Sequence, residues 1–228
     1  MNKGLKIFLY VLLALLCFGL GYGVSYITSK NVMDKKEENK VTTTKKIETV
    51  SKEEKAFKKI LNNEMQFNAT RWADTKVEKY YLKEYTPEES MGYVIDKYTY
   101  LDMDGNGTKE LIIMGTITNN RNELLDGMNL VFNYENGDVN CYLFSWRGLS
   151  DLRTDGSYMV SGGVSSSGIM RIKKFGDLKE EDQFEEEELA INEGDNYKLS
   201  GKMVSEEEYT NYLKDRDAKK EPEWKEYK

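Results

Sequence analysis

The acidic stretch Asp102–Ile113 (DMDGNGTKELII) constrains the fold of this chain more than any other segment. Just before it, Tyr98 and Tyr100 alternate with Thr99 and Leu101, and the run after it, Leu111–Thr118, is rich in β-branched residues. Alternation with a period of two and a β-branched composition are both typical of strands. We therefore expect the acidic stretch to join two strands of a β-hairpin, not two helices.

The oxygen-bearing side chains of this loop have the spacing of a calcium-binding loop. Ca²⁺ takes six to eight oxygen ligands, and side chains at loop positions 1, 3 and 5 can point inward around it. Gly107 occupies position 6, where the sharp turn favours a residue without a Cβ. The predicted ligands are the side chains of Asp102, Asp104, Asn106 and Glu110, with the backbone carbonyl of Thr108.

The loop departs from an EF-hand at position 12, where Ile113 replaces the bidentate glutamate. We therefore predict a structural Ca²⁺ site with a dissociation constant on the order of 10⁻⁴ to 10⁻³ M, not a calcium sensor. The alternative is an Asp- and Asn-rich turn whose side chains only close the hairpin and hold no metal.

The N-terminal region contains a charge-free run of 21 residues, Ile7–Ile27. Such a run is long enough to cross a membrane as a helix, and Lys3 and Lys6 before it favour a cytoplasmic N-terminus. We predict an anchor over residues 1–28, with single-pass localisation in the cell membrane and an extracellular body. A cleaved signal or a lipidated Cys17 are the alternatives.

Beyond residue 28 the pattern predicts three regions. Residues 29–50 are charged and threonine-rich, which is typical of a disordered linker. Residues 51–218 alternate between helical and strand-like patterns, with helices expected at about 52–67 and after a capping box at Ser205. Asn136-Gly137 between two alternating runs predicts a hairpin. We expect an α+β domain, an antiparallel β meander with flanking helices, followed by a flexible tail over 219–228.

Composition excludes several classes of function. The chain has no histidine, which removes the usual general base and the commonest zinc ligand. Its net charge of −7 argues against nucleic-acid binding, which needs a basic surface. Cys141 has no cysteine partner in the predicted domain, so we expect it to be a small core residue.

Two segments resemble a known group of proteins. YTYLDMDGNGTKELIIMG, Tyr98–Gly115, resembles the DxDGDGxxEL hairpin of uncharacterised secreted or lipid-anchored proteins of Gram-positive bacteria, and is similar to the calcium hairpin of integrin-type FG-GAP blades. YKLSGKMVSEEEY, Tyr197–Tyr209, resembles a C-terminal segment of those bacterial proteins. The resemblance implies that Asp102, Asp104, Asn106 and Glu110 are ligands, although Asn106 stands where aspartate is more usual.

These observations together predict a non-enzymatic protein, anchored in the membrane through residues 7–27, whose extracellular domain is stabilised by Ca²⁺. We expect it to bind another protein or a cell-wall glycan. Two alternatives stay open at this point. One is an envelope enzyme that uses carboxylates only, as glycosidases do. The other is an accessory subunit of an envelope complex.

Overall fold

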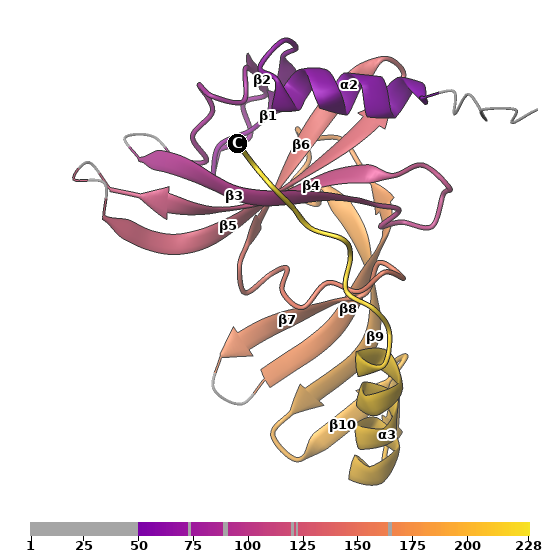
Figure 1. Cartoon of the computed structure of the whole chain (residues 1–228). Coiled ribbons are helices and arrows are strands. Elements are labelled where there is room, and N and C mark those ends of the chain that lie inside the picture. Colours follow the sequence, from indigo (N-terminus) through magenta and orange to yellow (C-terminus); the bar gives the residue numbers. More distant parts are fainter. Residues whose placement is uncertain (1–49, 73, 89–90, 120, 122, 164–165) are drawn as a thin grey trace, which may run out of the picture. The chain divides into compact units, whose positions relative to one another are not determined.

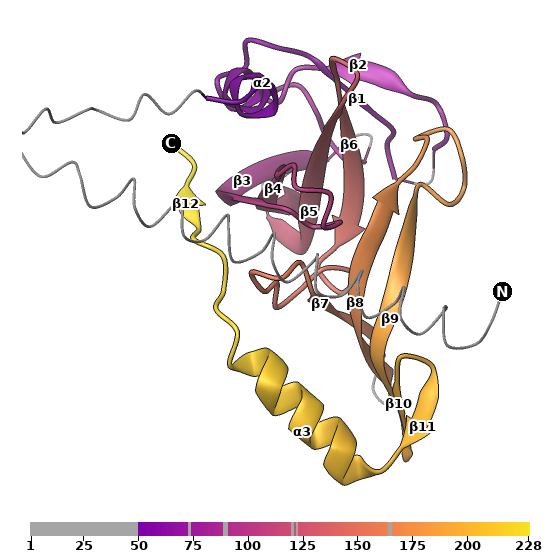
Figure 2. The ribbon, with the colours of Figure 1, turned by 90° about the vertical axis from the view of Figure 1, so that its right-hand side faces the viewer.

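The computed structural model describes residues 50–72, 74–88, 91–119, 121, 123–163 and 166–228. These residues belong to one compact unit, Thr49–Lys228. They contain two helices and twelve strands arranged in two sheets, which we call sheet A and sheet B (Figures 1 and 2).

Sheet A has seven strands in the order β12-β3-β4-β5-β6-β1-β2. Its centre is an antiparallel meander of β3 to β6, β1 pairs in parallel with β6, and β2 and β12 form the two edges. The strands are β1 (Phe67–Ala69), β2 (Glu78–Tyr80), β3 (Gly92–Leu101), β4 (Glu110–Thr118), β5 (Leu124–Glu135), β6 (Asp138–Ser145) and β12 (Lys225–Glu226).

Sheet B is antiparallel, with five strands in the order β11-β10-β9-β8-β7. The strands are β7 (Tyr158–Gly163), β8 (Ser166–Phe175), β9 (Phe184–Glu193), β10 (Asn196–Leu199) and β11 (Lys202–Val204). Helix α3 (Glu206–Asp217) packs on this sheet through Tyr209, which is buried with Ile169 and Ala190.

Sheet A is covered on both faces at its central strand β4, which explains why β4 is apolar almost throughout. Leu111 and Ile113 point to one face, where they share a core with Phe57 and Ile60 of helix α2 (Lys52–Leu61). Ile112 points to the opposite face, into a second core that includes residues of sheet B. Alternate side chains of a strand point to opposite faces, so a strand covered on both sides must be apolar at consecutive positions.

The predicted fold class is wrong. We expected an α+β domain with a transmembrane helix, but the described residues are mostly strand, with only two helices. The helix expected at 52–67 ends at Leu61, because Asn63 adopts a left-handed φ of 61° and its side chain accepts a hydrogen bond from the Lys83 N–H at 2.9 Å. The chain then turns and continues as β1.

The predicted membrane anchor and membrane localisation are also corrected. No helix in the described part of the chain is both long enough and apolar enough to cross a bilayer. The run 7–27 on which the prediction rested lies outside the described residues, as does nearly all of the predicted linker 29–50.

The C-terminal residues, which we expected to form a flexible tail, are ordered against sheet A. Lys225 and Glu226 pair with Tyr98 and Lys97 as β12. The Tyr227 hydroxyl donates to the carbonyl of Leu61 at 3.2 Å. Two aromatic side chains, Trp224 and Tyr227, pack against the cores on either side. These contacts hold the last residues against the sheet.

Candidate metal site

The acidic loop joins the end of β3 to the start of β4, as predicted. Leu101 pairs with Glu110 at the base of the hairpin, so Asp102 emerges directly beside Glu110. Gly105 and Gly107 have φ values of 73° and 88°, in the left-handed region that glycine adopts without strain. Met103, between the two aspartates, is completely buried in the core shared by the two sheets. This buried methionine anchors the loop.

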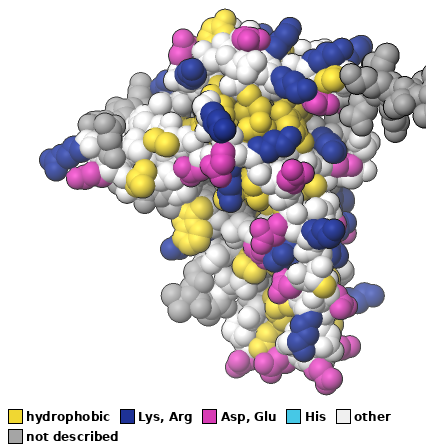
Figure 3. Space-filling model, in the orientation of Figure 1, with side chains coloured by type: hydrophobic (Ala, Val, Ile, Leu, Met, Phe, Trp, Pro, Cys, Tyr) yellow, Lys and Arg dark blue, Asp and Glu magenta, His cyan; other side chains and the backbone are white. Residues whose placement is uncertain are grey.

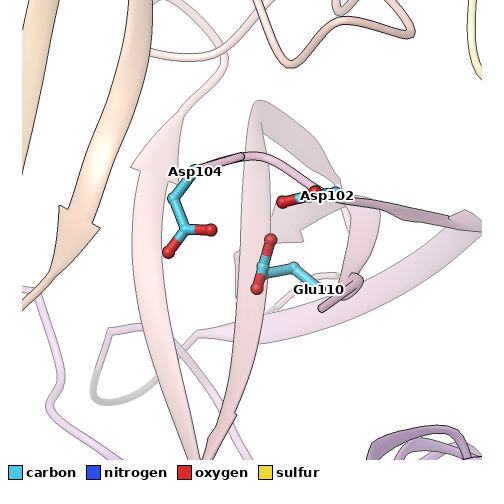
Figure 4. A group of neighbouring side chains, drawn as sticks. All are labelled: Asp102, Asp104 and Glu110. Atoms are coloured by element: carbon cyan, nitrogen blue, oxygen red, sulfur yellow. The ribbon is translucent and has the colours of Figure 1, made fainter. Parts of the chain in front are cut away.

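Three of the predicted ligands come together in the structure. Asp102, Asp104 and Glu110 each offer a carboxylate oxygen, and these oxygens all lie within 4.8 Å of one another. Figure 4 shows the three side chains converging from the end of β3, the loop and the start of β4. The group could hold a metal ion.

Backbone and side-chain amides together satisfy all but one of the carboxylate oxygens. Gly107 N–H donates to Asp102 Oδ2 at 2.9 Å, Asn106 N–H donates to Asp104 Oδ1 at 3.1 Å, and Met103 N–H donates to Glu110 Oε2 at 2.8 Å. The exception is Asp102 Oδ1, which is buried and has no hydrogen-bond partner. A buried carboxylate oxygen without a partner is costly, so this atom needs a ligand.

The electrostatics of the group also favour a cation. Glu110 is fully buried, and burial, reinforced by the nearby charges of Asp104 and Asp102, raises its pKa to about 8 despite the hydrogen bonds it accepts. Burial likewise raises the pKa of Asp104, with a further contribution from Asp102. Among the described residues, no lysine or arginine forms an ion pair with any of the three carboxylates. A bound cation would supply the missing positive charge.

The roles of Asn106 and Thr108 stay predictions. Asn106 is exposed, its Oδ1 accepts the Thr108 N–H at 2.6 Å, and its Nδ2 donates to Asp104 Oδ2 at 2.9 Å. In this arrangement Asn106 braces the loop as a turn. Because an amide oxygen has two lone pairs, this hydrogen bond does not by itself exclude Asn106 as a ligand.

Two residues that support the site were not predicted from the sequence. The first is Asn133 on β5, which is buried and donates from Nδ2 to Glu110 Oε1 at 3.3 Å. Leu111 pairs with Phe132, so Asn133 lies opposite Glu110, one step further along the two strands. An asparagine inside the apolar run NLVFNY was the available signal, because a buried polar side chain requires a partner.

The second is Gly156, in the turn before β7. Its φ is 79°, and a Cβ placed on it would lie 2.8 Å from the Met103 carbonyl oxygen and 3.2 Å from that of Asp102. The backbone of this turn therefore rests directly on the backbone of the acidic loop. The sequence identifies Asp155-Gly156 as a turn, but not what the turn touches.

Comparisons of the chain with models of protein families, with curated proteins and with solved structures find no match.

Proposed function

We propose that this protein is a non-enzymatic binding protein whose fold is stabilised by Ca²⁺ in the acidic loop. The observation that supports the metal most strongly is the buried, unpartnered Asp102 Oδ1 beside the carboxylates of Asp104 and Glu110. A hard divalent cation there would satisfy this oxygen and offset the repulsion of three carboxylates.

The donor set favours Ca²⁺ over Mg²⁺. All the candidate ligands are oxygens, and they come from a glycine-containing loop in which several carry hydrogen bonds from backbone amides. Ca²⁺ accepts irregular oxygen cages of six to eight ligands, whereas Mg²⁺ demands a near-ideal octahedron and keeps its waters.

The position of the loop supports a structural role for the ion. Glu110 begins a core strand, Asp102 follows another, and Met103 is buried between the sheets. The ion would therefore join β3, β4 and the turn at Gly156, where the two sheets meet.

The binding role is supported by a groove beside helix α2. The alternative of a carboxylate-only enzyme gains no support from this groove. Its acids are Glu53 and Glu54, which are neighbours on one helix, and Glu54 pairs with Lys58 at 3.0 Å. They do not form an opposed pair across a bound substrate.

The metal proposal is tested by calorimetric titration of the full chain with Ca²⁺, together with melting temperatures in Ca²⁺, Mg²⁺ and EDTA. We expect a dissociation constant on the order of 10⁻⁴ to 10⁻³ M and a higher melting temperature in millimolar Ca²⁺ than in Mg²⁺.

The matched variants are Asp102→Asn, which should abolish the Ca²⁺-dependent rise in melting temperature, and Asp195→Asn, which should keep it. Asp195 is an exposed aspartate in the turn between β9 and β10, far from the loop in sequence. Absence of heat and of any melting shift in the unmodified protein at millimolar Ca²⁺ would show that the loop is only a turn.

A further inference from the structure

A groove of about 710 Å³ runs between helix α2 and the edge of sheet A. It is lined from α2, from the exposed side of β3, from β12 and from the acidic loop at Gly107 and Lys109. Figure 3 shows hydrophobic side chains gathered just below α2, with lysine or arginine side chains around them. The volume is in the range of ligand sites, roughly 300 to 1,000 Å³.

The floor of the groove is aromatic. Tyr98 and Tyr100 are two apart on β3, so they point to the same face, and their ring centroids are 5.8 Å apart in an edge-to-face arrangement. Phe57 of α2 lies behind them, with its ring centroid 6.3 Å from that of Tyr100. Both tyrosines are only half-buried, so part of each ring faces the groove.

The tyrosine hydroxyls add hydrogen-bonding capacity. Neither hydroxyl has a hydrogen-bond partner among the described residues. Burial raises the pKa of Tyr100 to about 12, so its hydroxyl stays protonated at neutral pH. A polar ligand with an apolar ring face would match such a surface.

The rim carries a net positive charge on a protein that is acidic overall, because three lysines, Lys58, Lys109 and Lys225, stand against the two acids Glu53 and Glu54. Lys58 is neutralised by Glu54, but Lys109 and Lys225 form no ion pair with the described residues. Both are exposed, and Lys225 Nζ lies 5.7 Å from the centre of the Tyr100 ring. Two unpaired ammonium groups beside an aromatic floor favour a negatively charged ligand.

We propose that this groove binds an acidic oligosaccharide, with sugar rings against Tyr98 and Tyr100 and carboxylates on Lys109 and Lys225. The inference deepens the binding role proposed above and is independent of the metal. Sugar rings supply both the apolar face and the hydroxyls that the tyrosines require, and uronic-acid carboxylates supply the charge.

An acidic peptide is the competing ligand, and the sheet edge argues against it. Extended peptides commonly bind by adding a strand to an open edge. Beside this groove β12 already pairs with β3 at Lys97 and Tyr98, and the Tyr227 N–H donates to the Asp96 carbonyl at 3.2 Å. The outer edge is then β12 itself, which is only two residues long and offers little backbone for an added strand, so recognition through side chains is favoured.

The test uses calorimetric titration of the full chain with three kinds of probe. Hexagalacturonate and a hyaluronan hexasaccharide present acidic sugars, fully methyl-esterified hexagalacturonate keeps the rings without the charge, and hexaglutamate keeps the charge without the rings. We expect the acidic sugars to bind at least about tenfold more tightly than the ester, which loses the charge-assisted hydrogen bonds, and than the peptide, which loses the ring contacts with the tyrosines.

Variants locate the site. Lys109→Ala combined with Lys225→Ala should weaken binding of the acidic sugars by about tenfold or more, and Tyr98→Phe should weaken it while leaving the ring in place. Lys202→Ala removes an exposed lysine from β11, on sheet B, and should leave binding unchanged.

The outcomes separate this proposal from the metal proposal. Titrations are run both in saturating Ca²⁺ and in EDTA, so sugar binding and the response to Ca²⁺ are measured separately. The groove proposal can then fail while the metal proposal holds, or the metal proposal can fail while the groove proposal holds. Any one of three results would overturn the groove assignment. These are failure of both acidic sugars to bind, binding of hexaglutamate as tight as that of the acidic sugars, and an unchanged affinity for the acidic sugars in the lysine double variant.

Discussion

At the scale of single residues, Glu110 carries the most consequential environment in the protein. Its carboxyl is fully buried, accepts hydrogen bonds from the Met103 amide and the Asn133 side chain, and has a pKa raised to about 8. A buried carboxyl of this kind keeps its proton at neutral pH unless a cation replaces it. Proton and metal should therefore compete for the same site.

This competition predicts how stability depends on pH. Without metal, the folded state holds a proton on Glu110 that the unfolded state, with a pKa near 4.5, has lost. The free energy of unfolding therefore includes a contribution from this proton, which is complete below the Glu110 pKa of the unfolded state and is lost as the pH rises through the folded-state pKa of about 8. In EDTA, the melting temperature should therefore fall between pH 6 and 8.5, a window in which this chain has no histidine to titrate.

If the proposed Ca²⁺ site forms, Ca²⁺ should raise the melting temperature more at pH 8.5 than at pH 6, because the ion would bind the charged carboxylate. Glu110→Gln is the control, since it keeps the size of the side chain but removes the titrating group, and it should flatten the slope in EDTA. A melting temperature that rises across this window in EDTA would contradict the assignment of the proton to Glu110.

At the scale of elements, the acidic hairpin is held by its neighbours as much as by its own sequence. Met103 fixes it from within the core, Asn133 contacts it from β5, and the turn at Gly156 rests on its backbone. The Asp155-Gly156 turn is itself held firmly. Burial alone would raise the pKa of Asp155, but hydrogen bonds from Lys219 and Ser157 outweigh it and lower the pKa to about 2.

Gly156→Ala tests this contact. The added Cβ would meet the Met103 carbonyl at 2.8 Å in a backbone conformation that disfavours side chains. We expect a loss of roughly 1 to 3 kcal/mol in the free energy of unfolding, measured by denaturant titration, and a weaker affinity for Ca²⁺.

Gly194→Ala is the matched control for that substitution. Gly194 has a φ of 64° but no atom within 4 Å of an added Cβ, so it carries the backbone strain without the collision. Equal losses in the two variants, with unchanged Ca²⁺ affinity in both, would mean that the turn does not support the loop.

At the scale of the whole described unit, the C-terminal segment links the two sheets. Arg216, at the end of α3, is only 1% exposed and donates to Asp151 Oδ2 at 2.5 Å and to the Asp151 carbonyl at 2.5 Å. The segment then passes Thr99, which donates from its hydroxyl to the Glu223 carbonyl at 2.9 Å, and ends as β12. Sheet B, the loop after β6 and the edge of sheet A are thereby joined.

Asp151→Asn should be strongly destabilising, because it leaves the buried guanidinium of Arg216 without its main counter-charge. Asparagine tolerates the left-handed φ of 46° at this position, so the backbone is not disturbed. We expect a loss of about 2 to 4 kcal/mol in the free energy of unfolding.

Asp217→Asn is the matched control. Asp217 Oδ1 also lies 3.4 Å from a guanidinium nitrogen of Arg216, but the Asp217 side chain is 59% exposed. Removing the charge of Asp217 should therefore cost less than about 1 kcal/mol of the free energy of unfolding. Similar losses in the two variants, measured by denaturant unfolding, would show that burial of the ion pair is not what matters.

Local signals in the sequence determined the local structure. The strands around the acidic loop, the Asn136-Gly137 hairpin and the capping box at Ser205 all appear as predicted, because each depends on residues only a few positions apart. The same holds for the convergence of Asp102, Asp104 and Glu110, and Cys141 is buried as expected.

Only the tertiary structure decided the two-sheet architecture and the environment of the acidic loop. The pairing of β1 with β6, of β12 with β3, and the contacts of Asn133 and Gly156 with the loop join residues distant in the chain. Short segments such as Phe67–Ala69 and Lys225–Glu226 carry no periodicity of their own, and they become strands because an open sheet edge is available. The loop was recognisable from its spacing, but the burial that gives Glu110 its raised pKa comes from distant partners.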